Sequence, residues 1–553
     1  MKHLRKLMFA LMLLALLLNA CAQGKTQQPA PATVAPTDAF PAEQVPAEEV
    51  PADSTAPIPL QVFIDTGGED AAFVTESRLT KYMEEKFNVK FDVVSGTTDE
   101  SLTLMLASGD YPKLIYSSWF SMLDVVKYGE LGVFVPLEDL IAQYAPNVTK
   151  AFDENPNLKA AVYAPDGHIY MMPYWEECYH CSMAMKMWIN TAWLKAVGME
   201  MPTTTDEFEK VLIAFRDKDP NGNGKKDEIA LTGFTKGWNG DPWAFLMNAF
   251  IYNTGTESDY TYVNGDKVAF APIQPEWKEG LKYIKNLYAQ GLYDPQAFTQ
   301  NAEQFKNLAL GEDELVGVYA AGHLGMGVDP WVNLDRANKY EPILPLKGPA
   351  GVQLTPYWPN RGMDGSFAIT NKASQEEAIA FIKLLDWHYS TEGSVSAWFG
   401  PIDVGWTWAS PGDMGIDGGP AVWKVLESAS ADIQTDLTWN PIFYMPARLF
   451  LGWASSQDVY TTDGYERRLY LATKEYEKYK PAHIPPGGMY MTSEDSDTYS
   501  KLVVSIQSQV ETNTAAFITG EKDIDAEWDA YVAGFKDLQL DQYLAILQKY
   551  YKP

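Results

Sequence analysis

Short apolar strands alternate with helical segments between residues 58 and 120, and this alternation restricts the possible folds more than any other feature. The strand-like stretches are Ile58–Asp65, Val89–Val94 and Lys113–Tyr116, and apolar residues at helical spacing fill the intervals. Such alternation is typical of a parallel α/β sheet. Because ligands of these sheets bind beyond the carboxyl ends of the strands, we expect the corners Asp65–Gly68 and Ser117–Trp119 to line a ligand site.

The length of the chain requires more than one hydrophobic core. A chain of 553 residues is too long for a single core, so we expect two or more lobes. Its net charge of -30 argues against a nucleic-acid partner, because no basic stripe is present to neutralise phosphates. Most of the 17 tryptophans should be core residues, but a surplus of this kind is what a surface that stacks on sugar rings requires.

The N-terminal residues indicate export and lipidation. Basic residues precede an apolar run, Leu7–Leu18, which is too short to span a bilayer as a mature helix. The run ends in Leu-Asn-Ala-Cys, which resembles a bacterial lipobox, so we expect residues 1–21 to be a lipoprotein signal peptide with a lipidated, palmitate-bearing Cys21. The alternative is a conventional signal peptide with an incidental cysteine. Residues 22–57 are rich in Pro, Ala and Glu and should form a disordered linker. The folded part is therefore expected to be extracytoplasmic and anchored to the cell membrane by Cys21.

Residues 202–234 predict a capped helix followed by an oxygen-rich loop. Thr204 and Glu207 have the spacing of a capping box, and apolar side chains then recur at helical spacing as far as Phe215. The run from Asp219 to Gly224, Asp-Pro-Asn-Gly-Asn-Gly, should end the helix. A short strand is expected over residues 229–232.

Oxygen-bearing side chains alternate in this loop, so several of them can converge on one hard cation. The loop begins like the calcium loop of EF-hands, but its twelfth position, where a bidentate Glu is expected, is Ala230. Asp227 and Glu228 would therefore have to close the site. The expected ligands of a structural Ca²⁺ are Asp219, Asn221, Asn223, Lys225 (through its carbonyl), Asp227 and Glu228. The alternative is a solvated turn, since Asp, Asn and Gly favour turns for their own reasons.

Several segments resemble the family 1 extracellular solute-binding proteins, which are substrate-binding lipoproteins of ABC transporters. These segments are residues 202–234, the runs LMLASGDYPKLIY and GELGVFVPLEDLIAQYAPN, and the stretches Gly167–Pro173 and Trp188–Leu194. The branch that they resemble includes the calcium-containing alginate-oligosaccharide-binding proteins, in which the matching loop holds a structural Ca²⁺.

The resemblance implies an α/β, two-lobed periplasmic-binding-protein-like (Venus-flytrap) fold with three hinge crossings. It places an N-terminal lobe at 58–172 and 318–366 and a C-terminal lobe at 173–317 and 367–553. Closure of two lobes removes water from the cleft and strengthens each polar contact there. The implied function is to capture a carbohydrate, expected to be an oligosaccharide, and to deliver it to the permease subunits of an ABC importer. We expect a monomer.

Aromatic and polar residues in Gly- and Pro-rich loops are the candidates for contact with a sugar. Aromatic faces stack on the C–H faces of sugar rings, while carboxylates, amides and guanidinium groups bind hydroxyls. The candidates are Trp119, Tyr174, Trp175, Glu176, Trp238, Trp243, Trp331, Trp358, Arg361 and Trp406. The alternative for any single tryptophan is core packing, since large aromatic residues are mostly buried.

Cys178 and Cys181 flank His180 in a C-x-x-C pattern. In an extracytoplasmic protein, we expect a local disulfide or two unpaired thiols. A redox pair lacks the expected sheet context nearby, and a zinc site lacks a second pair of ligands elsewhere in the chain.

No sequence motif marks an enzyme. The chain contains no G-x-S-x-G, no H-E-x-x-H and no P-loop. A secreted glycosidase would need a carboxylate pair in a cleft, and the adjacent Glu176 and Glu177 point in opposite directions on an extended segment. We therefore expect a binding protein that is not an enzyme; a secreted glycosidase and a surface protein that adheres to polysaccharide are the alternatives.

Overall fold

The computed structural model describes the folded part of the chain. The described residues are 56–66, 70–96, 99–120, 122–255, 258–358, 365–426, 436–439, 441, 444–485 and 490–551. The chain divides into a unit of Met1–Ala52 and a unit of Asp53–Pro553. The predicted signal peptide, the lipidated Cys21 and most of the linker lie outside the described residues. Among the described residues, no helix is long and apolar enough to cross a membrane.

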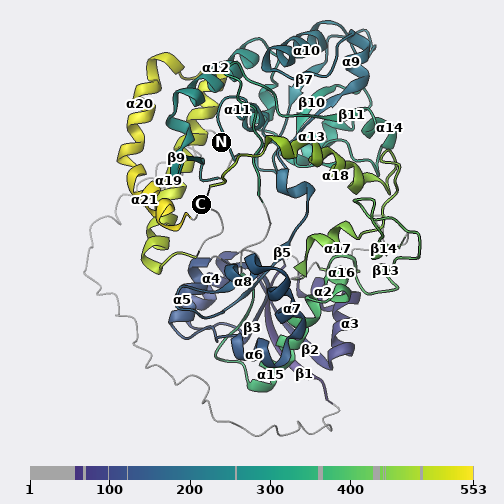
Figure 1. Cartoon of the computed structure of the whole chain (residues 1–553), viewed down its shortest axis with the longest axis vertical. Coiled ribbons are helices and arrows are strands. Elements are labelled where there is room, and N and C mark those ends of the chain that lie inside the picture. The colour runs from purple at the N-terminus through teal and green to yellow at the C-terminus, as the bar shows by residue number, and fades with distance from the viewer. Residues whose placement is uncertain are drawn as a thin grey trace, which may run out of the picture. The chain divides into compact units, whose positions relative to one another are not determined.

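The first sheet confirms the strand–helix alternation predicted near the N-terminus. Its strand order is β2-β1-β3-β12-β4, and β1 runs parallel to both β2 and β3 (Figure 1). The strands are β1 (Ile58–Asp65), β2 (Val89–Gly96), β3 (Leu114–Phe120), β12 (Gly365–Ile369) and β4 (Met172–Pro173). The helices near it are α2 (Ala71–Thr75), α3 (Arg78–Phe87), α4 (Asp99–Ser108), α5 (Met122–Glu130), α6 (Glu138–Tyr144), α7 (Pro146–Glu154), α8 (Pro156–Val162), α15 (Gln375–His388) and α16 (Thr391–Phe399).

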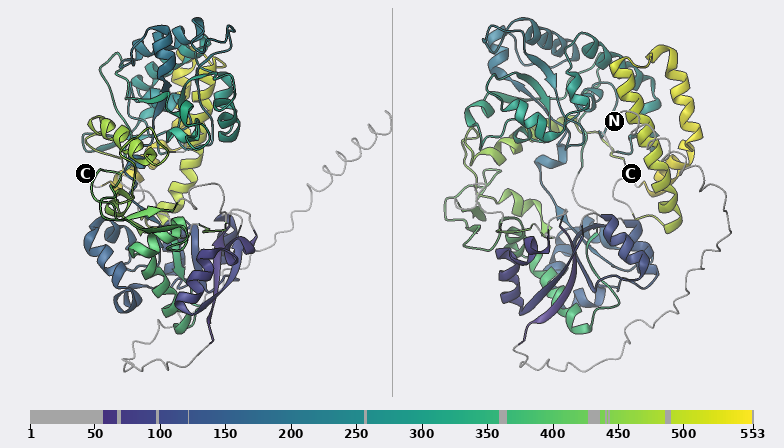
Figure 2. Two further views of the ribbon diagram at one scale, coloured as in Figure 1. Left: turned by 90° about the vertical axis from the view of Figure 1, so that its right-hand side faces the viewer. Right: turned by 180° about the vertical axis from the view of Figure 1, so that it is seen from behind.

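Helices cover both faces of the first sheet. Successive side chains of a strand point to opposite faces, so Val62 and Phe63 of β1 enter different hydrophobic clusters. Val62 packs in the cluster that contains Phe381 of α15, whereas Phe63 packs in the cluster that contains Leu102 of α4. Figure 2 shows these helices around the strands. A sheet buried on both faces explains why β1 is so rich in apolar residues.

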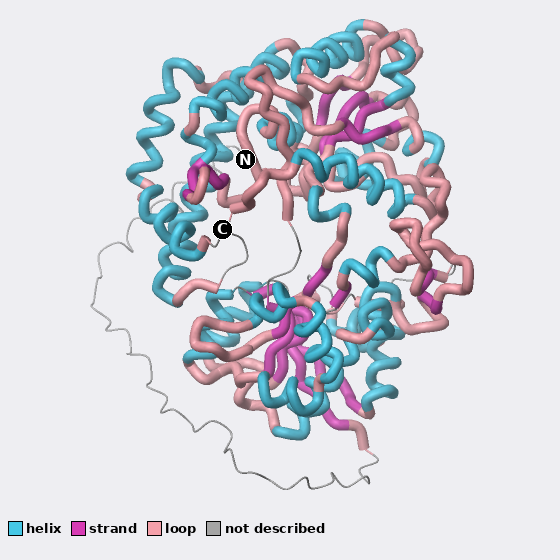
Figure 3. The backbone as a smooth tube through the Cα atoms, in the orientation of Figure 1, coloured by secondary structure: helices cyan, strands magenta, loops and turns pink. Residues whose placement is uncertain are grey.

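The second sheet has its own core. Its order is β11-β6-β10-β7, with β10 parallel to β7 and antiparallel to β6. Figure 3 shows its strands as a magenta group separate from the first sheet. The strands are β6 (Met187–Asn190), β7 (Ile229–Thr232), β10 (Val316–Ala320) and β11 (Tyr340–Ile343). The helices and the hairpin that follow these strands are α9 (Thr191–Val197), α10 (Thr205–Asp217), α11 (Pro242–Met247), β8 (Thr261–Asn264), β9 (Lys267–Phe270), α12 (Pro275–Ala289), α13 (Ala302–Ala309) and α14 (Leu334–Ala337).

The C-terminal helices add to the core of the second sheet. They are α18 (Tyr465–Tyr476), α19 (Ser493–Thr519), α20 (Ile524–Asp537) and α21 (Leu540–Tyr550). Val510 and Tyr543 of these helices pack in the same hydrophobic cluster as Ile189 of β6 and Leu231 of β7. Smaller elements lie between α16 and α18: β13 (Trp406–Trp408), β14 (Trp423–Val425), β15 (Tyr444–Met445) and α17 (Ala447–Leu451).

The predicted lobe boundaries need correction. Val316–Ala320 forms β10 inside the second sheet, so the predicted return to the first lobe at residue 318 is wrong. Conversely, β12 at 365–369 lies in the first sheet and α15 packs on it, so the assignment of 367–553 to the C-terminal lobe is wrong in its first part. The apolar pattern of a buried strand does not specify which sheet it joins, because that depends on pairing with distant strands. Within the described residues, the chain crosses from one core to the other on the segment that joins β4 to β6. It crosses again on the segments that join β11 to β12 and α15 to α18.

Candidate functional site

Two loops of the second sheet meet where its parallel strands end. Because β7 and β10 are parallel, their carboxyl ends lie at the same edge of the sheet. The loop after β7 carries Trp238, and the loop after β10 carries His323 and Trp331. The backbone N–H of Gly322 donates to the carbonyl of Trp238 over 2.9 Å, which ties the two loops together.

Trp238 lies flat against the loop after β10 because that loop offers no side chain at Gly322. A Cβ atom at this position would lie 2.3 Å from the Trp238 ring, closer than any real contact. The half-buried ring also faces the imidazole of His323, with the ring centroids 5.9 Å apart.

Trp331 stands at the exposed end of the same loop. Its side chain is 55% exposed, which is high for a tryptophan, and its ring packs edge-on against Tyr465 of α18 at 5.1 Å. Its backbone N–H donates to the carboxylate of Asp329 over 2.9 Å. These contacts fix the position of the ring and leave much of its surface open.

Tyr174 and Glu176 lie together on the segment that leaves the first sheet. This segment contains β5 (Trp175–Glu176), which pairs in parallel with β15. The Tyr174 hydroxyl donates to a Glu176 carboxylate oxygen over 2.6 Å. Trp358 is half-buried, and its backbone N–H donates to the carbonyl of Ser182 over 2.8 Å. Tyr174, which is also half-buried, and Trp358 stay candidates for ligand contact, whereas the side chain of Glu176 is only 6% exposed and is engaged by Tyr174.

Three predicted ligand residues are core residues instead. Trp175 is 1% exposed, Trp243 is 4% exposed and Trp406 is fully buried. The ring of Trp243 packs against that of Trp277 at 6.0 Å, and the Trp406 indole N–H donates to the Ser396 hydroxyl over 3.1 Å. The prediction that these rings contact a ligand is wrong, because a buried ring offers no free face. Neighbouring Gly and Pro residues indicate a loop but do not fix the direction of a side chain.

Two further predicted residues are not tested. Trp119 belongs to β3, but its side chain lies outside the described residues, as does the whole of Arg361.

Sequence reasoning missed His323 and Tyr465. His323 Nδ1 lies 2.7 Å from the Tyr465 hydroxyl, and the backbone N–H of Gly325 donates to the same hydroxyl over 2.8 Å. His323 could have been noticed as a polar residue just after an apolar strand. Nothing near Tyr465 in the sequence signals this contact, because the two residues belong to elements far apart in the chain.

The oxygen-rich loop follows a helix with the predicted cap. The capping box of Thr204 and Glu207 is present at the start of α10. Asp219 adopts a left-handed backbone conformation with φ of 47°, and Gly222 follows with φ of 72°, so the loop turns tightly.

Hydrogen bonds inside this loop satisfy only some of its oxygens. The Asn221 side-chain oxygen accepts from the backbone of Asn223 over 3.0 Å, and the second oxygen of Asp219 accepts from the backbone of Gly224 over 3.1 Å. The Asn223 side-chain oxygen accepts from Lys225 N over 2.8 Å, while its amide nitrogen donates to Asp227 over 3.0 Å. To ligate a metal through its oxygen, Asn223 would have to turn its amide.

Two buried carboxylate oxygens of the loop have no hydrogen-bond donor. They are Oδ1 of Asp219 and Oε1 of Glu228. Burial raises the pKa of the Glu228 carboxyl, and the negative charges of Asp219 and Asp227 raise it further. A buried acceptor without a donor is costly, and a divalent cation would satisfy both oxygens and offset the repulsion. The oxygen-rich donor set is therefore of the kind that a hard cation prefers. The carboxylate oxygens of Asp219, Asp227 and Glu228 do not all lie within 4.8 Å of one another, so the loop would have to rearrange to hold one ion.

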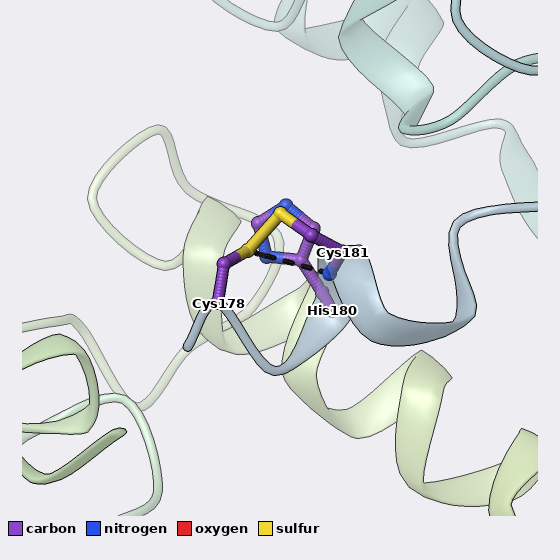
Figure 4. Close-up of side chains that lie close together, drawn as sticks. All are labelled: Cys178, His180 and Cys181. Carbon is purple, nitrogen blue, oxygen red and sulfur yellow. Dashed lines mark hydrogen bonds between the residues drawn. A yellow bond between two sulfur atoms is a disulfide. The ribbon is translucent and has the colours of Figure 1, made fainter. Parts of the chain in front are cut away.

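The cluster of Cys178, His180 and Cys181 is not a metal site of the same kind. The two cysteines form a disulfide, which decides between the two expected outcomes (Figure 4). Zinc binds thiolates, so this cluster offers no sulfur ligands while the disulfide is intact. The imidazole of His180 lies 3.3 Å from the carboxylate of Glu466 on α18.

Comparisons with known proteins agree with this architecture. No family model matches the chain. The fructooligosaccharide ABC transporter substrate-binding protein FusA of Streptococcus pneumoniae is 31% identical over 497 residues, which are 86% of this chain and 87% of FusA. The solved structure of FusA in complex with kestose has a TM-score of 0.73 and 28% identity, covering 89% of this chain and 98% of the other. A structure of a FusA EF-hand mutant in complex with fructo-nystose has a TM-score of 0.71.

Two other proteins are similar at greater distance. Lipoprotein LipO of Bacillus subtilis is 26% identical over 305 residues, which are 54% of this chain and 57% of LipO. The alginate-binding protein AlgQ2 shares the fold, with a TM-score of 0.67 at 23% identity over 90% of this chain and 98% of AlgQ2.

The two α/β cores and the loops at the carboxyl ends of their parallel strands define a two-lobed solute-binding protein. The chain belongs to the family 1 extracellular solute-binding proteins, the substrate-binding proteins of ABC transporters. The resemblance found in the sequence is confirmed.

Proposed function

We propose that this protein captures an oligosaccharide outside the cytoplasm and delivers it intact to an ABC importer. The observation that carries the proposal is the 31% identity to FusA, a fructooligosaccharide-binding protein, over 86% of the chain. The half-buried Trp238 and the exposed Trp331 support it, because sugar-binding sites need aromatic faces that a ligand can reach.

Binding without turnover is supported by the hydrogen bonds that the neighbouring carboxylates of Glu176 and Glu177 accept from the protein. Glu177 accepts hydrogen bonds from the Trp175 indole and from the backbone of Ala447, and Glu176 accepts from Tyr174. Each carboxylate is thus engaged by the protein itself, and a glycosidase needs two that face one sugar.

A structural Ca²⁺ is part of the proposal. Asp219, Asn221, Asn223, Asp227 and Glu228, with the carbonyl of Lys225, would hold it. When bound, the ion would neutralise the carboxylates and fix the loop between α10 and β7. The unsatisfied oxygens of Asp219 and Glu228 support this assignment, as does the related FusA, for which the structure of an EF-hand mutant has been solved.

The proposal also includes a membrane anchor at Cys21. The basic and apolar segments of a signal peptide precede this cysteine in the sequence, and LipO is a related lipoprotein. A lipidated Cys21 would keep a monomeric binding protein near its permease.

Calorimetry combined with product chromatography tests the function. The protein is titrated with kestose and a panel of neutral and acidic oligosaccharides, with the matching monosaccharides as controls. We expect one oligosaccharide class to bind at one site and to be recovered at its original length. Release of shorter sugars would favour a glycosidase, and the absence of heat with every saccharide would overturn the proposal.

A further inference from the structure

Four rings form a continuous row at the carboxyl edge of the second sheet. The row runs from Trp238 to His323, then to Tyr465 and Trp331, with centroid distances of 5.9, 6.1 and 5.1 Å. Its two ends are the tryptophans that keep some exposure, and its buried member is Tyr465, which is 4% exposed.

Hydrogen bonds fix the middle of the row. The N–H of Gly325 donates to the oxygen of Tyr465, so the hydroxyl hydrogen is left to donate to Nδ1 of His323. A buried hydroxyl needs such an acceptor. This assignment makes Nδ1 the acceptor and places the imidazole proton on Nε2.

The Nε2–H group of His323 is then a donor without an acceptor among the described residues. Burial lowers the pKa of His323 to about 4, so the ring is neutral at pH 7. No acceptor among the described residues receives a hydrogen bond from Nε2, and the side chain is partly exposed. A neutral N–H beside an aromatic ring matches the chemistry of a sugar, which presents hydroxyl acceptors at the edge of an apolar face.

We propose that His323 is a specificity-determining residue that donates its Nε2–H to a hydroxyl of a saccharide lying against the row, and that Tyr465 is the positioning residue that fixes its tautomer. This inference rests on the proposed oligosaccharide-binding function. Loss of a hydrogen bond that a site is built to make discriminates strongly between ligands, because the polar group of the protein is left unpaired.

The variants H323L, H323Q and Y465F separate the roles. H323L removes both nitrogens, H323Q keeps an N–H donor, and Y465F keeps the ring but removes the hydroxyl. The matched control is Y460F, which deletes a hydroxyl that donates to Glu341 over 2.9 Å outside the row. Calorimetry uses kestose and the same panel of neutral and acidic oligosaccharides as the test of the function.

We expect H323L to weaken binding by about tenfold or more, and Y465F to weaken it by roughly threefold to tenfold. H323Q should recover part of the loss, and Y460F should bind like the wild type. Binding by H323L within about twofold of the wild type would overturn the inference while leaving the proposed function intact. A wild-type protein that binds no saccharide would overturn both.

Nitrogen NMR of the ¹⁵N-histidine-labelled wild-type protein reads the tautomer of His323 without any measurement of affinity. The signals that are absent from the spectrum of H323Q assign His323. We expect a neutral ring with the proton on Nε2 at pH 7. A proton on Nδ1, or a charged ring, would contradict the assignment.

Discussion

Trp238 and Trp243 belong to one short segment of the second lobe, yet they lie in different surroundings. Trp238 is half-buried in the loop after β7, and Trp243 in the first turn of α11 is 4% exposed against Trp277. Both are tryptophans in the same Gly- and Pro-containing stretch. The difference teaches that position relative to the carboxyl edge of the sheet, and not residue type or loop composition, separates a candidate ligand contact from a core residue.

The largest effect that tests this comparison is on stability. Trp243→Ala should cost about 3–5 kcal/mol, because it empties a packed site in the core. The melting temperature should fall by roughly 10 °C, as measured by calorimetric melting, while the folded protein keeps its affinity for saccharide. Trp243→Phe is the control and should lose much less. An unchanged melt with lost affinity would break the comparison.

Removal of calcium adds a third region to the comparison, the oxygen-rich loop at 219–228, and tests what that loop contributes to stability. The loop at 219–228 lies at the surface, but a cation held there would stabilise the folded state. At a calcium concentration of 100 times Kd, chelation should remove about 2.7 kcal/mol and lower the melting temperature by roughly 5–10 °C. Asp219→Ala should abolish this response, whereas Asp313→Ala, a neighbouring acidic residue, should retain it. An unchanged melt after verified removal of the metal would count against the site.

The two tryptophans at the ends of the row should show the opposite behaviour to Trp243. Trp238→Ala and Trp331→Ala should each cost about 1–2 kcal/mol of binding, or roughly tenfold in affinity, with little change in melting temperature. The matched control is Trp408→Ala, since Trp408 on β13 is 48% exposed and lies outside the row of rings. Calorimetric titration measures the affinities. Equal losses for all three variants would mean that the effect is not specific to the row.

The smallest effect concerns the pH dependence of the calcium-free protein. The pKa of Glu228 is raised by burial and by neighbouring carboxylates, so the folded state holds its proton more tightly than the unfolded chain does. Stability should therefore fall as pH rises from the ordinary value of 4.5 through the raised one. Thermal melts across this range should show the slope, and Glu228→Gln or added calcium should flatten it. If the stability of the wild-type protein rises with pH over this range while that of Glu228→Gln does not, the raised pKa of Glu228 is contradicted.

The sequence predicted those features that depend on neighbours along the chain. The first strand, the capping box of α10 and the oxygen-rich loop after α10 were located correctly, since local spacing decides each of them. Features that depend on distant partners could not be predicted. The choice of sheet for Val316–Ala320 and the contact between His323 and Tyr465 are set by tertiary packing. The burial of Trp406 against Ser396 is also set by tertiary packing.

Native mass spectrometry of the protein incubated with oligosaccharides tests the central claim most directly, because one spectrum reports both capture and cleavage. With kestose or another member of the panel, we predict a complex whose mass exceeds that of the free protein by one intact oligosaccharide, and free sugar of unchanged length. A spectrum without any saccharide complex, or with shortened sugars accumulating over time, would contradict the account.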